Sequence, residues 1–149
     1  MALTFRKITK LDYGRCAEII VSAYKEEPWF NKWTMEEASL RVEATMSGFN
    51  ARGFVAEVDG KVIAQCLGRI DYYNENWKQY VIDEFSIIAS VQGQGIGTKF
   101  MNFVSTSLKE EQIDRVWLMT GAQMAANFYQ KNGFEVSDEG IKMTLELKD

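Results

Sequence analysis

Three glycines that separate a strongly apolar segment from an amphipathic one constrain the fold of this chain more than any other feature. Residues 80–89 are dense in apolar side chains, which predicts a central strand. From Ile96 to Leu108, apolar residues recur at helical spacing. The glycines are therefore predicted to form a strand-to-helix turn, where the unpaired backbone N–H groups of a helix N-terminus can bind an anionic ligand such as a diphosphate.

Three phosphate-binding patterns compete for this turn. The dinucleotide pattern GxGxxG fails because Thr98 stands in place of the third glycine, and the Walker A pattern fails because Gly97-Thr98-Lys99 lacks the order Gly-Lys-Ser/Thr. What remains is Gln92-x-x-Gly95-x-Gly97, which by itself fits a simple turn as well as a ligand site. Its position between a strand and a helix favours the ligand site.

Apolar runs predict strands along the whole chain, at residues 3–8, 54–58, 61–70, 80–89, 115–120 and 141–147. Asp59-Gly60 supplies the positive φ angles of a two-residue hairpin turn between the second and third strands. The fifth strand follows a helix and is expected to lie parallel to the fourth. The last segment alternates apolar and polar residues, which is typical of a half-buried strand.

Helices are predicted between these strands. Two follow the capping signals Thr9-x-x-Asp12 and Thr34-x-x-Glu37, a third follows the glycine turn, and a short fourth helix ends at Asn132-Gly133. The apolar residues expected on the first two helices are Leu11, Cys16, Ile19 and Ala23, and then Met35, Ala38, Val42, Met46 and Phe49. The element order is β-α-α-β-β-β-α-β-α-β, and one domain is expected over residues 1–149.

The composition narrows the chemistry. The chain contains no histidine, which excludes His-based zinc sites and Ser-His or Cys-His catalytic pairs, so acid-base work falls to Asp, Glu, Tyr or Lys, and no metal is expected. Cys16 and Cys66 are far apart among apolar neighbours, which predicts buried, unreactive thiols in a reducing cytoplasm.

The charge and hydropathy patterns limit the partners. A formal net charge of -4 does not fit the basic footprint of a nucleic-acid binder; it suits a small cationic substrate, and equally a soluble protein kept away from its isoelectric point. No apolar run reaches membrane-spanning length, and the N-terminus has no signal-peptide core. We therefore expect a cytoplasmic protein that binds neither nucleic acid nor membrane.

Two motifs together resemble the signatures of the GNAT N-acetyltransferases: the glycine turn after an apolar strand, and Phe128-Tyr129 through Gly133-Phe134 downstream. Segment 27–38 is similar to that of bacterial aminoglycoside 6'-N-acetyltransferase-like members. The resemblance implies a mixed α/β (α+β) sheet of about six to seven strands flanked by about four helices. It also implies acetyl-CoA as co-substrate and a homodimer whose interface the final strand can support.

The resemblance further implies where acetyl-CoA binds. Backbone amides of the glycine turn are expected to hold the CoA pyrophosphate, while the backbone at the end of the preceding strand pairs with pantetheine as an added strand would. The implied cofactor-binding residues are Phe85, Ser86, Ile87, Gln92, Gly93, Gln94, Gly95, Ile96, Gly97 and Thr98.

Acetyl transfer to an amine requires a base, and Asp83 and Glu84 are the candidates. Adjacent acids in an apolar strand are costly to bury, so at least one is expected to face a wet cleft. Successive side chains point to opposite faces, so both can face it only if a bulge intervenes. The resemblance favours Glu84, with Asp83 second, and the structural alternative is a salt bridge to Lys or Arg.

Spacing alone favours Tyr129 as a core aromatic residue. The resemblance, with both motifs present, instead assigns to Tyr129 the proton for the leaving thiolate. The amide of Ile87 is the candidate for polarising the thioester carbonyl. Because neither cysteine has an activating partner, direct transfer in a ternary complex is expected.

Aromatic residues in irregular segments are candidates for binding the acceptor: Trp29, Phe30, Trp33 and Tyr72, together with Glu84. The alternative for Trp29 and Trp33 is that they pack a loop onto the core or a dimer partner. The predicted function is acetyl transfer to a primary amine of a small cationic acceptor. The alternatives are acetylation of a protein or peptide, and a non-catalytic acetyl-CoA-binding module.

Overall fold

The computed structural model describes residues 2–27 and 29–148, which group into two units, 2–119 and 120–148. The first unit contains β1 (Leu3–Lys7), α1 (Tyr13–Lys25), α2 (Met35–Met46), β2 (Ala51–Val58), β3 (Lys61–Tyr72), β4 (Lys78–Ile87), α3 (Ile96–Glu110) and β5 (Arg115–Trp117). Short 3-10 turns lie at Lys10–Asp12, Asn74–Asn76 and Ala89–Val91. The second unit contains α4 (Gln123–Lys131).

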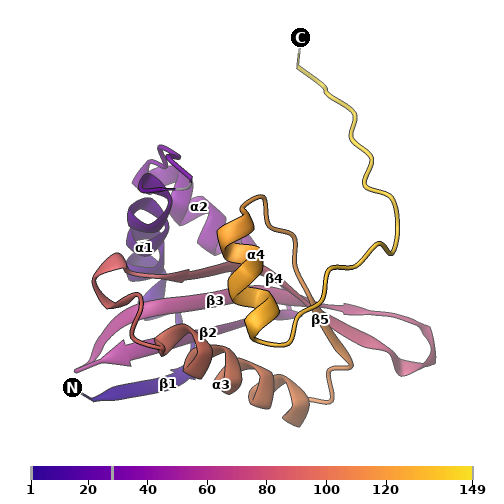
Figure 1. Ribbon diagram of the computed structural model, residues 1–149, viewed down its shortest axis with the longest axis horizontal. Coiled ribbons are helices and arrows are strands. Elements are labelled where there is room, and N and C mark those ends of the chain that lie inside the picture. The colour runs from indigo at the N-terminus through magenta and orange to yellow at the C-terminus, as the bar shows by residue number, and fades with distance from the viewer. Residues whose placement is uncertain (1, 28, 149) are drawn as a thin grey trace. The chain divides into compact units, whose positions relative to one another are not determined.

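The strands of the first unit form one sheet of five strands in the order β1-β2-β3-β4-β5 (Figure 1). All neighbours are antiparallel except β4 and β5, which are parallel as predicted. The hairpin between β2 and β3 turns at Asp59 and Gly60, whose φ angles are 51° and 82°. The predicted hairpin turn is therefore confirmed.

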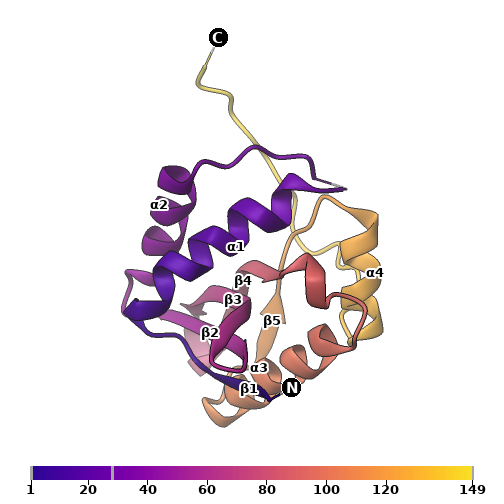
Figure 2. The same ribbon diagram turned by 90° about the vertical axis from the view of Figure 1, so that its left-hand side faces the viewer.

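Helices cover both faces of this sheet, with α1 and α2 on one side and α3 on the other (Figures 1 and 2). On the first face, Cys16 and Val42 belong to a buried cluster that also includes Leu67 of β3. On the second face, Phe100 of α3 stacks on Phe85 of β4, with ring centroids 5.5 Å apart. The central strand is thus buried from both sides, which explains its apolar density.

The capping signals predicted where the first two helices begin, but not all of the residues assigned to their apolar faces. The Thr34 hydroxyl accepts the Glu37 N–H at 3.1 Å and the Glu37 carboxylate accepts the Thr34 N–H at 2.9 Å, so the predicted capping box is confirmed. The placement of Leu11 and Phe49 on these helices is wrong, because both lie outside α1 and α2 and are 96% and 86% exposed. Met35 lies on α2 as predicted but is 45% exposed.

The prediction of a final strand at 141–147 is wrong for the described residues, and the sheet has five strands rather than six to seven. The alternating apolar side chains Ile141, Met143, Leu145 and Leu147 are 83–89% exposed. Alternation shows only that a segment suits a strand; forming one requires a neighbour to pair with. Within the described part of the chain, no helix combines the length and apolar content needed to cross a membrane.

Candidate active site

The glycine turn joins β4 to α3 in the predicted manner. Gly93 and Gly95 have φ angles of 81° and 77°, a left-handed conformation that glycine adopts without strain. Gly95 is the N-cap residue of α3, and no side chain among the described residues caps it. The turn is exposed, and α3 is anchored beneath it by Ile96, which is 3% exposed. The first amides of α3 therefore remain available to an anion.

The edge of β4 that faces β5 is paired over only part of its length. The parallel ladder joins Gln79–Val81 to Arg115–Trp117 and ends there. Residues 82–87 of β4 pair with β3 alone among the described strands. This leaves a stretch of open strand edge that runs directly into the glycine turn.

Backbone alternation decides which residues of the open edge can bind a ligand. The Ile88 N–H donates to Ile63 O at 3.0 Å, on the β3 side. In an antiparallel ladder, successive residues direct both backbone groups to opposite sides, so Ile87 and Phe85 turn theirs outward. The Gln92 side chain already uses this edge, because its Nε2 donates to Ile87 O at 2.9 Å. By the same alternation, the backbone groups of Ser86 point toward β3.

A β-bulge separates the two candidate acids. Leu67 of β3 lies opposite Glu84, and the next residue, Gly68, lies opposite Ile82, so Asp83 is the extra residue. Without the bulge, two successive side chains would point to opposite faces. With it, the side chains of both acids reach partners on the same face of the sheet, the one covered by α1 and α2.

Both acids are engaged by charged or polar partners from distant parts of the chain. Glu84 is buried and accepts a hydrogen bond from Tyr24 Oη at 2.7 Å and from Arg41 Nε at 3.0 Å. Both Asp83 oxygens accept from Arg69 Nη1, at 2.8 and 2.9 Å, and its backbone carbonyl accepts from Arg41 Nη2 at 3.1 Å. The ion pairs weighed as the structural alternative are therefore present.

Two of the predicted acceptor-binding aromatics gather beside Glu84. Trp29 and Trp33 pack against Tyr24, with ring centroids 5.4 and 6.4 Å from it. Because the Tyr24 hydroxyl holds Glu84, these indoles belong to the same cluster as the acid.

The other two aromatics lie elsewhere. Tyr72, at the far end of β3, stacks on Phe49 at 6.1 Å. Phe30 is 65% exposed and stacks on no other aromatic ring among the described residues. The predicted aromatic set is therefore not one group in the structure.

Tyr24 and Arg41 are the residues that sequence analysis missed. They lie on α1 and α2, 60 and 43 residues before Glu84 in the chain. No local motif marks either of them. Only the packing of both helices on the sheet brings them to the acid.

Tyr129 lies on α4, in the second unit. Its ring packs edge-on against Phe128 and Phe134, at 5.3 and 5.4 Å. The helix ends as predicted: Gly133 has a φ angle of 93°, the Phe134 N–H donates to Tyr129 O, and the Gly133 N–H donates to Gln130 O. This is a Schellman cap, which fixes Phe134 next to the tyrosine.

Ser86 and the two cysteines are buried. Ser86 is 6% exposed and shares a hydrogen bond of 3.2 Å with Gln65 Nε2. Burial raises the pKa of both the Cys16 and Cys66 thiols to about 12, as expected for unreactive cysteines. No group of three His, Cys, Asp or Glu side chains that could hold a metal ion occurs in the described part of the chain.

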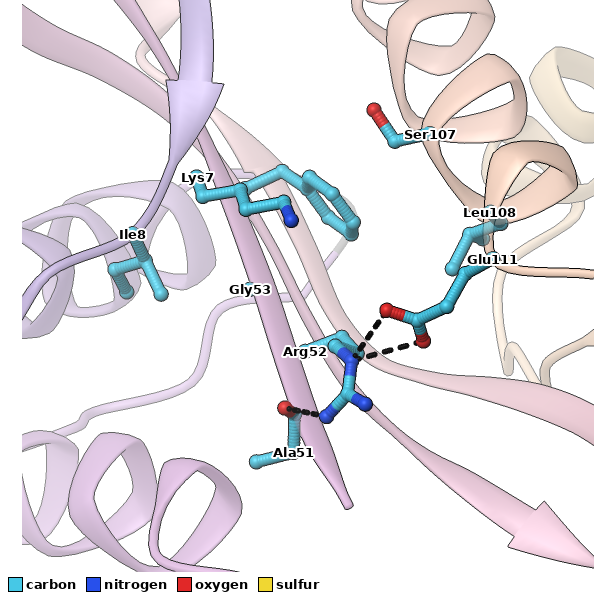
Figure 3. Close-up of a pocket in the computed structure, with 9 residues that line it drawn as sticks. Lys7, Ile8, Ala51, Arg52, Gly53, Ser107, Leu108 and Glu111 are labelled. Carbon is cyan, nitrogen blue, oxygen red and sulfur yellow. Dashed lines mark hydrogen bonds and ion pairs between the residues drawn. The ribbon is translucent and has the colours of Figure 1, made fainter. Parts of the chain in front are cut away.

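Strands of the sheet line part of two recesses on the first unit. The larger, of about 330 Å³, lies between the C-terminal end of α2 and the β3 and β4 strands, and is lined by Arg41, Ala44, Thr45, Ser47, Gly48, Asn50, Arg69 and Asp83. The smaller, of about 160 Å³, lies between β1, β2 and α3, where Arg52 Nε bonds both oxygens of Glu111 at 2.9 Å (Figure 3). Only the larger recess contains one of the predicted site residues.

Residues 50–136 match a family described as an acetyltransferase (GNAT) domain. A possible acetyltransferase from Clostridium difficile 630 has a similar fold, with a TM-score of 0.80 and 16% identity over 98% of this chain and 99% of that one. A comparison with curated proteins found no match.

Two further solved structures share the fold. An aminoglycoside acetyltransferase from an uncultured soil metagenomic sample, in complex with sisomicin, has a TM-score of 0.73 and 16% identity over 98% of this chain and 97% of that one. A predicted acetyltransferase with acetyl-CoA from Clostridium acetobutylicum has a TM-score of 0.74 and 18% identity over 96% of each chain.

Proposed function

Since the chain belongs to the GNAT acetyltransferase family, we propose that it transfers an acetyl group from acetyl-CoA to a primary amine of a small cationic acceptor, by direct attack in a ternary complex. The observation that carries this proposal is the open edge of β4 running into an uncapped helix N-terminus. An extended pantetheine suits the first feature and a pyrophosphate suits the second.

Acetyl-CoA is proposed to lie along residues 85–98. The outward N–H of Ile87 is available to polarise the thioester carbonyl, and the outward groups of Phe85 to pair with pantetheine. Gln92 would have to release Ile87 O for full pairing. The turn residues from Gln92 to Thr98 would surround the pyrophosphate.

In the proposed reaction, the acceptor amine attacks the thioester carbonyl carbon, the C–S bond breaks, and CoA leaves as a thiolate. Glu84 takes the proton of the amine, directly or through a water molecule. Each of its oxygens accepts one hydrogen bond in the structure, and a carboxylate oxygen has a second lone pair for another donor. Asp83 is the second candidate base, with a side chain 19% exposed against 5% for Glu84.

Tyr129 is proposed to give a proton to the leaving thiolate. A phenol with a pKa of about 10 can protonate a thiolate once the two are hydrogen-bonded. The cysteines take no part, since a buried thiol with a raised pKa is a poor nucleophile.

The acceptor is proposed to bind where Trp29 and Trp33 gather beside Glu84. One structural neighbour is an aminoglycoside acetyltransferase in complex with sisomicin, which supports a small amine acceptor. An aminoglycoside 6'-N-acetyltransferase-like specificity, a cytoplasmic location and a homodimer stay predictions.

Replacing Glu84 tests the proposed chemistry. Glu84→Gln keeps the shape of the side chain but cannot take a proton, so kcat should fall about 100-fold or more while the Kd for acetyl-CoA stays within about twofold. Thiol release from acetyl-CoA with a panel of amines measures the first quantity and calorimetry measures the second. Unchanged turnover in both Glu84→Gln and Asp83→Asn would refute the assigned base. A wild-type protein that binds acetyl-CoA but acetylates neither amines nor peptides would be a binding module.

Replacing Gly95 tests the cofactor site. Gly95→Asp places a carboxylate where the pyrophosphate is proposed to bind, at a φ of 77°, and should weaken acetyl-CoA binding about tenfold or more. Gly60→Asp is the matched control, because Gly60 is also an exposed glycine with positive φ, in the β2–β3 hairpin. Equal acetyl-CoA affinity in the two variants would show that the turn does not bind the cofactor.

A further inference from the structure

The larger of the two recesses is lined by two arginines, Arg41 and Arg69, and by Asp83. Each guanidinium is ion-paired with a carboxylate, Arg41 with Glu84 and Arg69 with Asp83. The two guanidinium side chains are 40% and 43% exposed. Both are therefore half-buried and still accessible to a solute.

The arginines retain unused donors. Arg41 bonds Glu84 through Nε and the Asp83 carbonyl through Nη2. Arg69 bonds Asp83 through Nη1, and its Nε lies 3.7 Å from Asp71. Among the described residues this leaves Arg41 Nη1 and Arg69 Nη2 without a hydrogen bond. A guanidinium held by a carboxylate on one edge is oriented to offer its other edge to an oxyanion.

The recess begins at the proposed reaction centre. Asp83 is the bulge residue next to Glu84, and Arg41 contacts both of them. A molecule with its amine at Glu84 can thus extend an attached group into the recess. The other polar lining side chains, Thr45, Ser47 and Asn50, each donate to a backbone carbonyl, at 2.8, 3.1 and 2.8 Å. The two guanidinium groups are therefore the main donors that this lining offers to an oxyanion.

We propose that the acceptor carries an oxyanion, a carboxylate or a phosphate, on the same small molecule as its amine, and that Arg41 and Arg69 bind this group in the recess. The inference rests on the proposed acetyltransferase function and changes its acceptor from a simple cation to a small molecule with a charge of each sign. The acceptor is cationic at the reacting end, near the two acids, and anionic at the other end. An amino acid and an amino sugar phosphate are the two sources of this chemistry.

Matched acceptor pairs test this specificity. Glucosamine 6-phosphate is compared with glucosamine, and a panel of amino acids with their carboxamides, in the thiol-release assay. In at least one pair the anionic member should have a kcat/KM about tenfold or more above that of the neutral one, and the pair that shows it identifies the oxyanion. Equal values within every pair would overturn the inference while leaving the acetyltransferase function standing.

Replacing Arg69 shows whether the arginines provide the preference. Arg69→Gln should remove it by raising KM for the anionic member alone, whereas Arg52→Gln, which breaks an ion pair in the smaller recess, should leave it intact. An equal loss for both members of a pair would mean that Arg69 only supports the bulge. If Arg69→Gln fails to fold, Arg69→Lys retains the charge but loses the planar fork, and should still weaken the preference.

A binding measurement makes the inference testable without turnover. Calorimetry on protein saturated with CoA, so that the glycine turn is filled, compares glucosamine 6-phosphate with glucosamine and each amino acid with its carboxamide. Tighter binding of an anionic member, lost in Arg69→Gln, supports the inference even if no acceptor is acetylated. Equal binding within every pair overturns it.

Discussion

At the scale of single residues, the charge of the buried Asp12 is compensated by partners from the preceding segment of the chain. Asp12 is buried and accepts from both terminal nitrogens of Arg6 at 2.8 Å. It also accepts the Thr9 N–H at 2.8 Å, which sets the entry into α1. The Arg6 guanidinium, together with this backbone hydrogen bond, holds the pKa of Asp12 below its usual value.

A depressed pKa makes the contribution of Asp12 to stability depend on pH. The contribution is complete above the unfolded pKa of about 3.9 and is lost as the pH falls through the lower folded pKa. Asp12→Asn should therefore reduce the free energy of unfolding by about 1–3 kcal/mol at pH 7, with the difference shrinking below about pH 4. Urea titrations at pH 7 and pH 3 measure it. The exposed Asp138→Asn is the control, and an equal deficit at both pH values would contradict the assignment.

At the scale of elements, the start of α2 is set by neighbours in the sequence, whereas its position on the sheet is set by contacts with distant residues. The Thr34 capping box starts the helix, and its local signal is visible in the sequence. The buried face of α2, with Ala38 and Val42, attaches it to the sheet. On the same helix, Arg41 is directed toward Glu84 by that docking, so a structural cap and a site residue share one element.

Removing the cap should therefore lower the stability of the protein. Thr34→Ala leaves the Glu37 N–H without its acceptor and should lower the free energy of unfolding by about 1 kcal/mol. Thr34→Ser keeps the hydroxyl and should retain most of the stability. Denaturant unfolding of the three proteins measures the effect, and equal midpoints for the alanine and serine variants would show that the cap is dispensable.

At the scale of the whole molecule, the average composition predicted the buried core but not the charged groups of one site. The acidic net charge suggested a cationic substrate, but it did not indicate that two arginines, each ion-paired with a carboxylate, line the larger of the two recesses. The apolar content did predict a continuous core, with Cys16, Ile20, Phe100 and Tyr80 among its fully buried side chains. The overall apolar content predicts how much of a chain is buried, but the net charge does not predict the charged groups of a single site.

The buried thiols report on the integrity of the first unit. Cys16 and Cys66 are both 0% exposed, so a thiol reagent at pH 8 should label neither in the native protein and both after unfolding. The labelling rate should follow the denaturant dependence of unfolding. Ser39→Cys, on the exposed side of α2, is the positive control. Rapid labelling of either native cysteine, at a rate independent of denaturant, would contradict the packed core.

The sequence by itself determined the features that depend on near neighbours in the chain. The Asp59-Gly60 hairpin, the Thr34 cap, the Gly133 helix end and the glycine turn all follow from backbone preferences within a few residues. The parallel β4–β5 crossover followed as well, because one helix separates the two strands.

Only the tertiary structure decided the features that depend on distant partners. The bulge at Asp83 arises from the register against β3 and turns both acids to one face. The partners of Glu84 come from two other elements, and segment 141–147 has the pattern of a strand but pairs with none among the described residues. Strand register and side-chain contacts are set by packing between segments that lie far apart in the chain. A local sequence pattern does not identify the segment with which it will pair.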